Sequence, residues 1–288
     1  MKVFITGYLG FLGSRLFHEL SKTHETYVNC LYINIANYAF YDKWLCEVRP
    51  DIIIHCAAES NVTRCEMHHD LADEKNIIAT HLLVAIAKKI DSTFIYISSD
   101  QVYHRFLNEG NEEEICYPET YYGYTKLMGE QDVLEHLNKF YILRLSMQLG
   151  LDSDKLGKNR NQLINKLIHK VKNDKTIICD KDCFRNYTYV YDTVNFIGNL
   201  VSSPSSTFPT GIYNVSSDCT MTISGVYKYI LKHAQFSEDR INTLIREVII
   251  KEPYDMRMNT SKLANLSKRL PLLTDGINRC MKAYAILK

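Results

Sequence analysis

A tyrosine and a lysine stand four residues apart in the stretch ETYYGYTKLMGEQ. Tyr122 and Lys126 would share one face of a helix, because residues at i and i+4 lie one above the other. A free tyrosine has a pKa near 10, and a nearby ammonium favours the phenolate; lowering that pKa by about 3 units requires about 4 kcal/mol. Such a tyrosine can donate its proton to an oxygen that becomes an alkoxide. The pair predicts acid–base chemistry at a carbonyl or hydroxyl group.

A serine supplies a second hydroxyl. Ser99 ends the apolar run FIYISSD, which reads as a buried strand. In a parallel sheet the carboxyl ends of the strands face the crevice that holds a cofactor, so Ser99 is placed to polarise the same carbonyl oxygen. The structural alternative is that Ser99 caps the next turn. Tyr121 and Tyr124 have no lysine four residues on, and neither is a candidate.

Three glycines separate the first strand from the first helix. In KVFITGYLGFLG, Gly7, Gly10 and Gly13 recur at every third residue. Glycines there permit a tight turn, a close approach of backbone amides to a pyrophosphate, and close packing of helix on strand. The phosphate would then meet the free N–H groups and the positive end of the helix. The alternative is an ordinary strand–helix turn.

The segment expected at the adenosine ribose carries no charged residue. Dinucleotide sites for NAD have an Asp or Glu about 20 residues after the glycines, but YVNCLYINI offers none, and no Arg or Lys for a 2′-phosphate. Asn29 or Cys30 is expected beside the ribose. Arg15 either reaches a 2′-phosphate or lies on a solvated helix surface. Because no carboxylate would repel a 2′-phosphate, the sequence favours NADP(H) over NAD(H) and leaves both open.

These residues need a sheet to position them. Short apolar runs alternate with helical periodicities: KVFITG, TYVNCLYI, DIIIHCAAE, TFIYISSD and FYILRLSM read as strands, and FLGSRLFHELSK, DEKNIIATHLLVAIAKKI and YYGYTKLMGEQDVLEHL as helices. This alternation predicts an α/β fold, a Rossmann-type doubly wound parallel sheet with a smaller interleaved C-terminal lobe. We expect residues 1–148, joined by 186–215, to bind a dinucleotide. Residues 149–185 and 216–288 are expected to form the substrate lobe.

The composition excludes several classes of protein. The chain has 288 residues, 46% hydrophobic and 23% charged, which is typical of globular proteins, and its net charge of +1 gives no support for nucleic acid or membrane binding. Nine cysteines without a secretory leader predict a reducing, cytoplasmic location. No apolar stretch is long enough to span a membrane. The adjacent His68 and His69 should point apart, and no metal site is predicted.

Several motifs together resemble the extended short-chain dehydrogenase/reductase family: the three glycines, CAAE at 56–59, ISSDQVY, the Tyr122–Lys126 pair and RNYTYVYDTV. Within it, YGYTKLMGEQ, MRMNTSKL and LPLLTDGINRCMKAYAIL are most similar to dTDP-4-dehydrorhamnose reductase and related nucleotide-sugar 4-ketoreductases. The resemblance implies that Ser99, Tyr122 and Lys126 are catalytic. It implies cofactor contacts at Gly7, Gly10, Phe11, Leu12, Gly13, Asn29, Cys56, Ala57, Ala58, Asn76, Tyr122 and Lys126.

The two residues after Ser99 reduce the number of candidate reactions. Dehydratases of the family carry an Asp-Glu pair there, and the GDP-fucose synthase branch has a cysteine in place of the glutamate; this chain has Asp100 and Gln101. Epimerases commonly hold NAD with the ribose carboxylate that is missing here. The resemblance therefore implies NAD(P)H-dependent reduction of the C4 ketone of a nucleotide-activated (6-deoxy)hexose. Substrate contacts are implied at Asp100, Gln101, Asn161, Arg185 and Arg257.

The alternatives for these residues and for the protein stay open. Asp100 could instead cap a turn, and each arginine could form a surface ion pair worth about 0–1 kcal/mol. Another reading is a nucleotide-sugar 4-epimerase of the same family. A third is a non-catalytic regulatory subunit similar to the β subunit of methionine adenosyltransferase. By likeness, a homodimer is expected through the helices that flank the helix of Tyr122.

Overall fold

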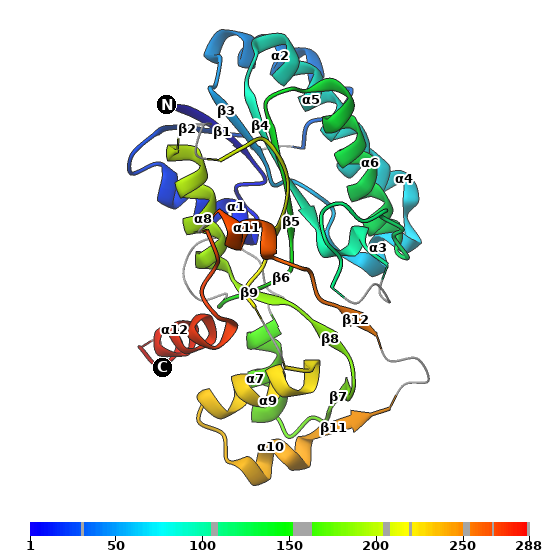
Figure 1. Cartoon of the computed structure of the whole chain (residues 1–288), viewed down its shortest axis with the longest axis vertical. Coiled ribbons are helices and arrows are strands. Elements are labelled where there is room, and N and C mark those ends of the chain that lie inside the picture. Colours follow the sequence, from blue (N-terminus) through cyan, green and yellow to red (C-terminus); the bar gives the residue numbers. More distant parts are fainter. Residues whose placement is uncertain are drawn as a thin grey trace.

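Six parallel strands form the central sheet of this computed structural model, in the order β10-β5-β4-β3-β1-β2 (Figure 1). The structure describes residues 1–29, 32–104, 109–151, 163–203, 208–218, 221–249, 254–266 and 268–286. The strands are β1 (Lys2–Thr6), β2 (Glu25–Val28), β3 (Ile52–His55), β4 (Thr93–Ser99), β5 (Phe140–Leu145) and β10 (Gly211–Val215). The predicted Rossmann-type, doubly wound parallel sheet is confirmed.

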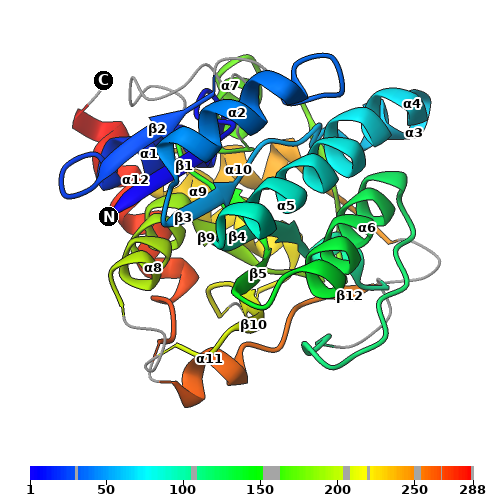
Figure 2. The same cartoon turned by 90° about the horizontal axis from the view of Figure 1, so that it is seen from above.

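Helices cover both faces of this sheet, as Figure 2 shows. Helices α1 (Phe11–Leu20) and α8 (Val190–Ser202) pack on one face, and α2 (Tyr38–Val48), α5 (Ala79–Ile90) and α6 (Tyr121–His136) on the other. Successive residues of β1 point to opposite cores: Val3 joins the α1–α8 side and Phe4 the α2–α5–α6 side, both fully buried. Burial on both faces is why these strands are apolar without alternation. None of the helices in the described ranges is long and apolar enough to cross a bilayer.

Most of the predicted helices and strands form, with shifted ends, and some segments have a different secondary structure from the predicted one. Helix α2 was not among the predicted helices. The predicted helix over 73–90 begins as a π-helix, η1 (Asp73–Ile78), and continues as α5. The segment before α8 is a short strand, β9 (Tyr187–Tyr189), which pairs with β6 (Met147–Leu149). A π-helical turn widens the helix and is frequent near functional sites.

A smaller lobe lies at one end of the sheet (Figure 1). Its core packs α7 (Leu163–Lys172) against α9 (Ile223–His233), α10 (Glu238–Leu244) and α12 (Leu273–Ile286). Two parallel strand pairs complete it: β7 (Ile177–Asp180) with β11 (Ile245–Val248), and β8 (Phe184–Arg185) with β12 (Asp255–Met256). Within the segment 216–288, expected in this lobe, Leu263 of α11 (Ser261–Asn265) packs instead in the core beneath the sheet.

A buried hydrogen-bonded chain ties the ends of β1 and β3 to α5. The Ala57 N–H donates to Thr6 Oγ1 (3.1 Å), Thr6 Oγ1 lies 2.7 Å from His55 Nδ1, and His55 Nε2 lies 3.0 Å from Thr80 Oγ1. Thr80 gives its own proton to the Asn76 carbonyl (2.6 Å). His55 Nε2 is therefore the donor to Thr80, and Nδ1 accepts from Thr6. Burial lowers the pKa of His55 to about 3, so the ring is neutral.

The buried, neutral ring of His55 predicts that the protein loses stability in acid. Because the unfolded imidazole has a pKa near 6.5 and the folded one about 3, the unfolded state binds more protons between these values. The free energy of unfolding should fall as the pH drops below 6.5, by about 4 kcal/mol on approaching pH 3. Urea unfolding at pH 7.5 and 4.5, followed by the fluorescence of the single tryptophan, Trp44, measures it.

Two variants isolate the contribution of His55. His55→Gln should be less stable at pH 7.5 but lose much less stability between pH 7.5 and 4.5 than the unaltered protein. His169→Gln, at an exposed position of α7, should keep the original pH dependence. An equal acid loss in His55→Gln and the unaltered protein would show that His55 does not cause it.

Candidate active site

The turn between β1 and α1 has room only for glycine at two positions. Gly7 has φ +68°, and a Cβ there would lie 2.8 Å from the Ala57 nitrogen. A Cβ on Gly13 would lie 2.3 Å from the Gly7 carbonyl oxygen. Gly10 is the N-cap of α1, and no side chain caps that end. The first N–H groups of α1 are thus left for an anion, as the glycine spacing predicts.

A cleft runs from this turn along the carboxyl ends of the strands. Its main cavity measures ≈ 450 Å³ and extends from the glycine turn to Arg185 of β8 in the smaller lobe. A second hollow of ≈ 140 Å³ adds Asn29 and Ala57 and shares Gly7, Gly10, Tyr32, Cys56 and Ala58 with the first. The glycine turn at its floor follows β1, where the strand order reverses, the usual ligand site of such sheets.

Most predicted site residues line this cleft. They are Gly7, Gly10, Phe11, Leu12, Gly13, Asn29, Cys56, Ala57, Ala58, Ser99, Asp100, Gln101, Tyr122, Lys126 and Arg185. Asn76 and Arg257 are not among the lining residues. Asn161 and Cys30 lie outside the described residues. The structure therefore brings together side chains from β4, α6 and β8 that are far apart in the chain.

Ser99 and Tyr122 line the same cleft. Burial and, less strongly, the negative charge of Asp100 raise the pKa of Tyr122 to about 12, against the smaller lowering effects of the Ser99 hydroxyl and the Arg185 charge. The sequence predicted that a nearby lysine would favour the phenolate; in the structure desolvation outweighs such a contribution. Tyr122 is therefore a phenol that keeps its proton at neutral pH. Ser99 also caps η2 (Asp100–Val102) by accepting from the Gln101 N–H (3.2 Å), so both of its predicted roles are compatible.

Lys126 is buried one helical turn from Tyr122. The residue is 2% exposed, and its ammonium lies 4.0 Å from the centre of the Tyr96 ring. Burial lowers the pKa of Lys126 to about 7, against the raising effect of Glu130. Glu130 in turn pairs with Arg144 of β5 (Nη2–Oε2 2.7 Å). The amine thus sits near its own titration midpoint at neutral pH and can gain or lose a proton in response to a neighbouring charge.

Asn76 lies behind the cleft and supports it through hydrogen bonds. Its Oδ1 accepts from the Glu59 N–H (2.7 Å), and its Nδ2 donates to the Glu59 carbonyl (3.1 Å) and to Thr125 Oγ1 (2.9 Å). Thr125 Oγ1 donates to the Tyr122 carbonyl (2.8 Å). Asn76 is 1% exposed and holds the loop after β3 against α6. The structure gives Asn76 this supporting position, and the cofactor contact implied by the resemblance stays a prediction.

The sequence did not point to Thr6, His55 and Thr80, whose hydrogen bonds connect Asn76 to the end of β1. Thr6 and His55 are register partners in neighbouring strands and are the last residue of each. The signal was present in the sequence: two otherwise apolar strands, KVFIT and IIIH, both end on a side chain that forms hydrogen bonds. Together with Asn76 they connect the glycine turn to the backbone of Tyr122.

Neither prediction for Arg15 holds. Arg15 is 1% exposed; its guanidinium donates to the Phe11 carbonyl (2.6 Å) and the Leu151 carbonyl (3.0 Å). It also lies 4.1 Å from the centre of the Phe11 ring. Arg15 therefore joins α1 to the segment after β6 and is neither solvated nor directed at a ribose. The helix face that seemed exposed is covered by residues more than a hundred positions along the chain.

The predicted substrate contacts are paired with carboxylates. Arg185 binds Asp100 through two bonds, Nε–Oδ2 at 2.8 Å and Nη2–Oδ1 at 2.9 Å, and the two side chains are 15% and 1% exposed. The pair crosses the cleft from β8 to η2. Arg257 instead pairs with Asp255 (Nη2–Oδ2 2.5 Å) and stacks 4.8 Å from the Phe184 ring centre.

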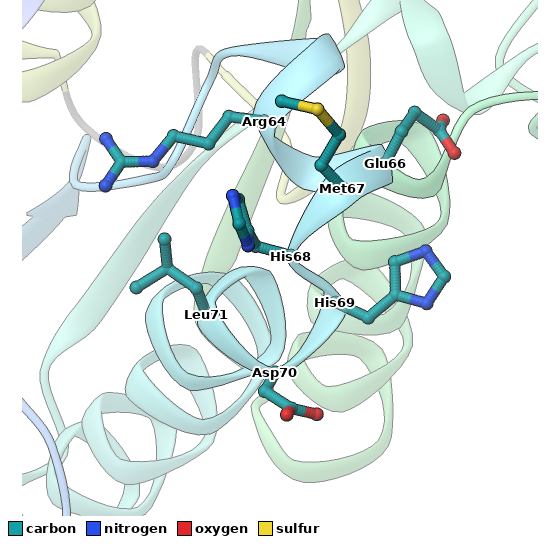
Figure 3. Close-up of a pocket in the computed structure, with 7 residues that line it drawn as sticks. All are labelled: Arg64, Glu66, Met67, His68, His69, Asp70 and Leu71. Carbon is teal, nitrogen blue, oxygen red and sulfur yellow. The ribbon is translucent and has the colours of Figure 1, made fainter.

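A separate, open hollow of ≈ 660 Å³ lies over α3 (Val62–Met67) and α4 (His69–Ala72). Figure 3 shows the rings of His68 and His69 pointing to different sides of the chain. His69 stacks on Tyr121, with ring centres 3.6 Å apart, and the Glu66 carboxylate accepts from the Tyr121 N–H (2.6 Å). Within the described ranges no three His, Cys, Asp or Glu residues form a group suited to a metal. These residues support the first turn of α6.

Comparisons with known proteins agree with this architecture. A crystal structure of dTDP-4-dehydrorhamnose reductase from Bacillus anthracis in complex with NADP superposes with a TM-score of 0.85 and 27% identity, covering 98% of each chain. The methionine adenosyltransferase 2 subunit beta of Xenopus laevis is 29% identical over 235 residues, 77% of this chain and 68% of that protein. The spore coat polysaccharide biosynthesis protein SpsK of Bacillus subtilis is 26% identical over 255 residues, 87% of this chain and 84% of that one.

A family model matches residues 1–286 of the chain. It agrees with the resemblance stated from the motifs, and the reductase structure agrees with it over nearly the whole chain. On the strength of that match, the chain belongs to the family described as RmlD substrate binding domain.

Proposed function

We propose that this protein is an NAD(P)H-dependent oxidoreductase that reduces the C4 ketone of a nucleotide-activated 6-deoxyhexose. The observation that carries the proposal is the meeting of Ser99, Tyr122 and Lys126 with the glycine turn in one cleft. A hydroxyl, a protonated phenol and an amine there match the needs of a carbonyl reduction. The likeness to a dTDP-4-dehydrorhamnose reductase crystallised with NADP supports both the reaction class and the cofactor.

The cleft fits a dinucleotide. The uncapped end of α1 and the glycines without space for a Cβ suit a pyrophosphate. Asn29 and Tyr32 line the hollow expected for the adenosine, and no carboxylate lines it among the described residues. A 2′-phosphate would meet no repulsion there, which supports NADPH over NADH. When bound, the nicotinamide supplies a hydride to the ketone carbon.

The side chains of this protein handle the proton and the developing charge. Tyr122 donates its phenolic proton to the O4 oxygen as that oxygen becomes an alkoxide. Because burial keeps the phenol protonated at neutral pH, its proton is available to the alkoxide as that charge forms. Ser99 donates a hydrogen bond to the oxyanion. Lys126, whose pKa of about 7 leaves it free to take up a proton, stabilises the tyrosinate that forms.

Gln101 argues against the dehydratase chemistry of related enzymes. It occupies the position of the base that removes a C5 proton in family dehydratases, and an amide cannot accept that proton. In the structure its Oε1 accepts from Thr120 Oγ1 (2.9 Å), the hydroxyl that caps α6. Gln101 thus supports the helix of Tyr122, and simple reduction needs no further group.

The assignment of domains belongs to this proposal. We assign cofactor binding to residues 1–148 with 186–215, and substrate binding to 149–185 with 216–288. Asn161 and Arg257, implied by the resemblance, would contact the nucleotide or the sugar from that lobe. A homodimer through the flanking helices and a cytoplasmic location complete the proposal.

A second candidate function is supported by a specific observation. The methionine adenosyltransferase 2 subunit beta of Xenopus laevis is 29% identical over 77% of this chain. The alternative is a subunit that modulates a partner enzyme and binds the dinucleotide without turnover. The two functions differ in what the phenol of Tyr122 must do.

The first test removes that phenol. Tyr122→Phe should lower kcat for reduction by about 10²–10⁴-fold, because the proton donor is lost, while NADPH binding measured by nicotinamide fluorescence stays within about threefold. Tyr124→Phe, at a 41% exposed position on the same helix, is the matched control and should keep full activity. A Tyr122→Phe enzyme that retains a third of its activity would contradict the assignment, and a regulatory subunit would respond to neither substitution.

The second test identifies the reaction. The protein is incubated with a panel of 4-keto-6-deoxy sugar nucleotides, and absorbance at the nicotinamide band is followed with NADPH and with NADH. We expect stoichiometric oxidation, faster with NADPH at equal concentration. Formation of a C4 isomer without net oxidation would identify an epimerase instead. No turnover of any sugar, combined with tight NADPH binding, would favour the regulatory subunit.

A further inference from the structure

We propose that Arg185 and Asp100 are positioning residues that control, as a pair, where the hydroxyl proton of Ser99 points. The inference rests on the proposed function of this site and goes beyond it, since the resemblance assigns both residues to substrate contact. Neither residue needs to touch the reacting atoms for this role. They act through Ser99.

The Ser99 hydroxyl has one proton, and two acceptors compete for it: the Asp100 carboxylate and the oxyanion that forms at the ketone. Its Oγ donates to Asp100 Oδ1 (3.1 Å) and accepts from the Gln101 N–H (3.2 Å), and Tyr122 lines the same cleft. To stabilise an oxyanion at the ketone, the same proton must leave Asp100 and point into the cleft. The strength with which Asp100 holds this proton therefore sets the free energy of the productive orientation.

Arg185 weakens the hydrogen bond that Asp100 accepts from the Ser99 hydroxyl. Asp100 Oδ1 already accepts from Arg185 Nη2, and Asp100 Oδ2 accepts from Arg185 Nε, so both carboxylate oxygens have charged donors. The Asp100 side chain is only 1% exposed, so solvent offers little replacement. A buried carboxylate deprived of a charged partner binds its remaining donor more strongly. Without Arg185, that remaining donor is the Ser99 hydroxyl.

Arg185 also offsets part of the effect of the Asp100 charge on Tyr122. The negative charge of Asp100 makes the phenol harder to ionise, and the positive charge of Arg185 makes it easier. The effect of Asp100 is the larger of the two, so Arg185 offsets only part of it. Asp100 belongs to η2, the 3₁₀-helix that follows β4, and Arg185 to β8 of the smaller lobe. The ion pair therefore depends on the two parts being in register across the cleft.

Suppression of one substitution by another tests the proposal in the reduction assay. Arg185→Met should lower kcat about tenfold or more with little change in KM, because Asp100 then retains the Ser99 proton. Adding Asp100→Asn should restore kcat to within about threefold of the unaltered enzyme, since no charged acceptor remains. In a Ser99→Ala background, Arg185→Met should change kcat less than twofold. Arg240→Met, which breaks an exposed ion pair with Asp174, is the matched control and should have no effect.

A direct contact with the substrate diphosphate gives a different result. Arg185→Met would then raise KM, Asp100→Asn would not restore activity, and the loss would persist in the Ser99→Ala background. Any of these three outcomes overturns the proposal. Arg185→Lys keeps the charge without the two-donor geometry and should fold where Arg185→Met does not; its kcat should fall about threefold and recover with Asp100→Asn.

A second readout needs no substrate and separates this inference from the proposed function. Tyrosine labelled with ¹³C at Cζ reports ionisation by NMR, and Tyr122→Phe assigns the resonance. Asp100→Asn should shift the Tyr122 titration about one pH unit lower, and Arg185→Met should shift it higher. If no sugar nucleotide is reduced but these opposite shifts occur, the proposed function fails and the coupling stands. Shifts of the same sign, or none, contradict the coupling whatever the activity.

Discussion

The burial of the Lys126 amine is the constraint to which the rest of the site is fitted. An ammonium that is 2% exposed needs compensation, and the structure provides it from the Tyr96 ring at 4.0 Å and from Glu130 one turn along α6. Glu130 is then itself buried, and Arg144 of β5 and Ser98 of β4 pair with it. These contacts fix α6 on β4 and β5. The approach is so close that a Cβ on Gly129 would lie 2.0 Å from the Tyr96 hydroxyl oxygen.

A second set of contacts makes the cofactor turn and the helix of Tyr122 one unit. The neutral ring of His55 has a single donor and a single acceptor, and each is used, toward Thr80 and Thr6 respectively. From Thr80 the hydrogen bonds continue through Asn76 to Thr125 and the Tyr122 carbonyl. A shift of the glycine turn would therefore rearrange buried polar groups and break their hydrogen bonds.

What the sequence predicted well is what local spacing determines. The glycine turn, the one-turn separation of Tyr122 and Lys126, and apolar strands such as 52–55 depend on residues close in the chain, and the structure brings them into one cleft. The Asp100–Arg185 pair joins residues 85 positions apart, and the burial of Arg15 depends on Leu151. Neither partner is visible from a local pattern. The same limit applies to Tyr122, because spacing revealed its neighbouring lysine but not the desolvation that raises its pKa.

The energetics of Lys126 bear on whether this cleft does more than hold a ligand. A shift of its pKa from 10.5 to about 7 means that folding with this side chain buried costs about 4 kcal/mol at neutral pH. A methionine of similar length would avoid that cost, since apolar residues in place of buried charges are often neutral or stabilising. A dinucleotide could be held by the glycine turn and the end of α1 without such a group. An amine kept near its titration midpoint beside a protonated phenol is instead what proton transfer requires, because it can match a charge that forms only during reaction. The physical chemistry of this one side chain therefore favours catalysis over passive binding.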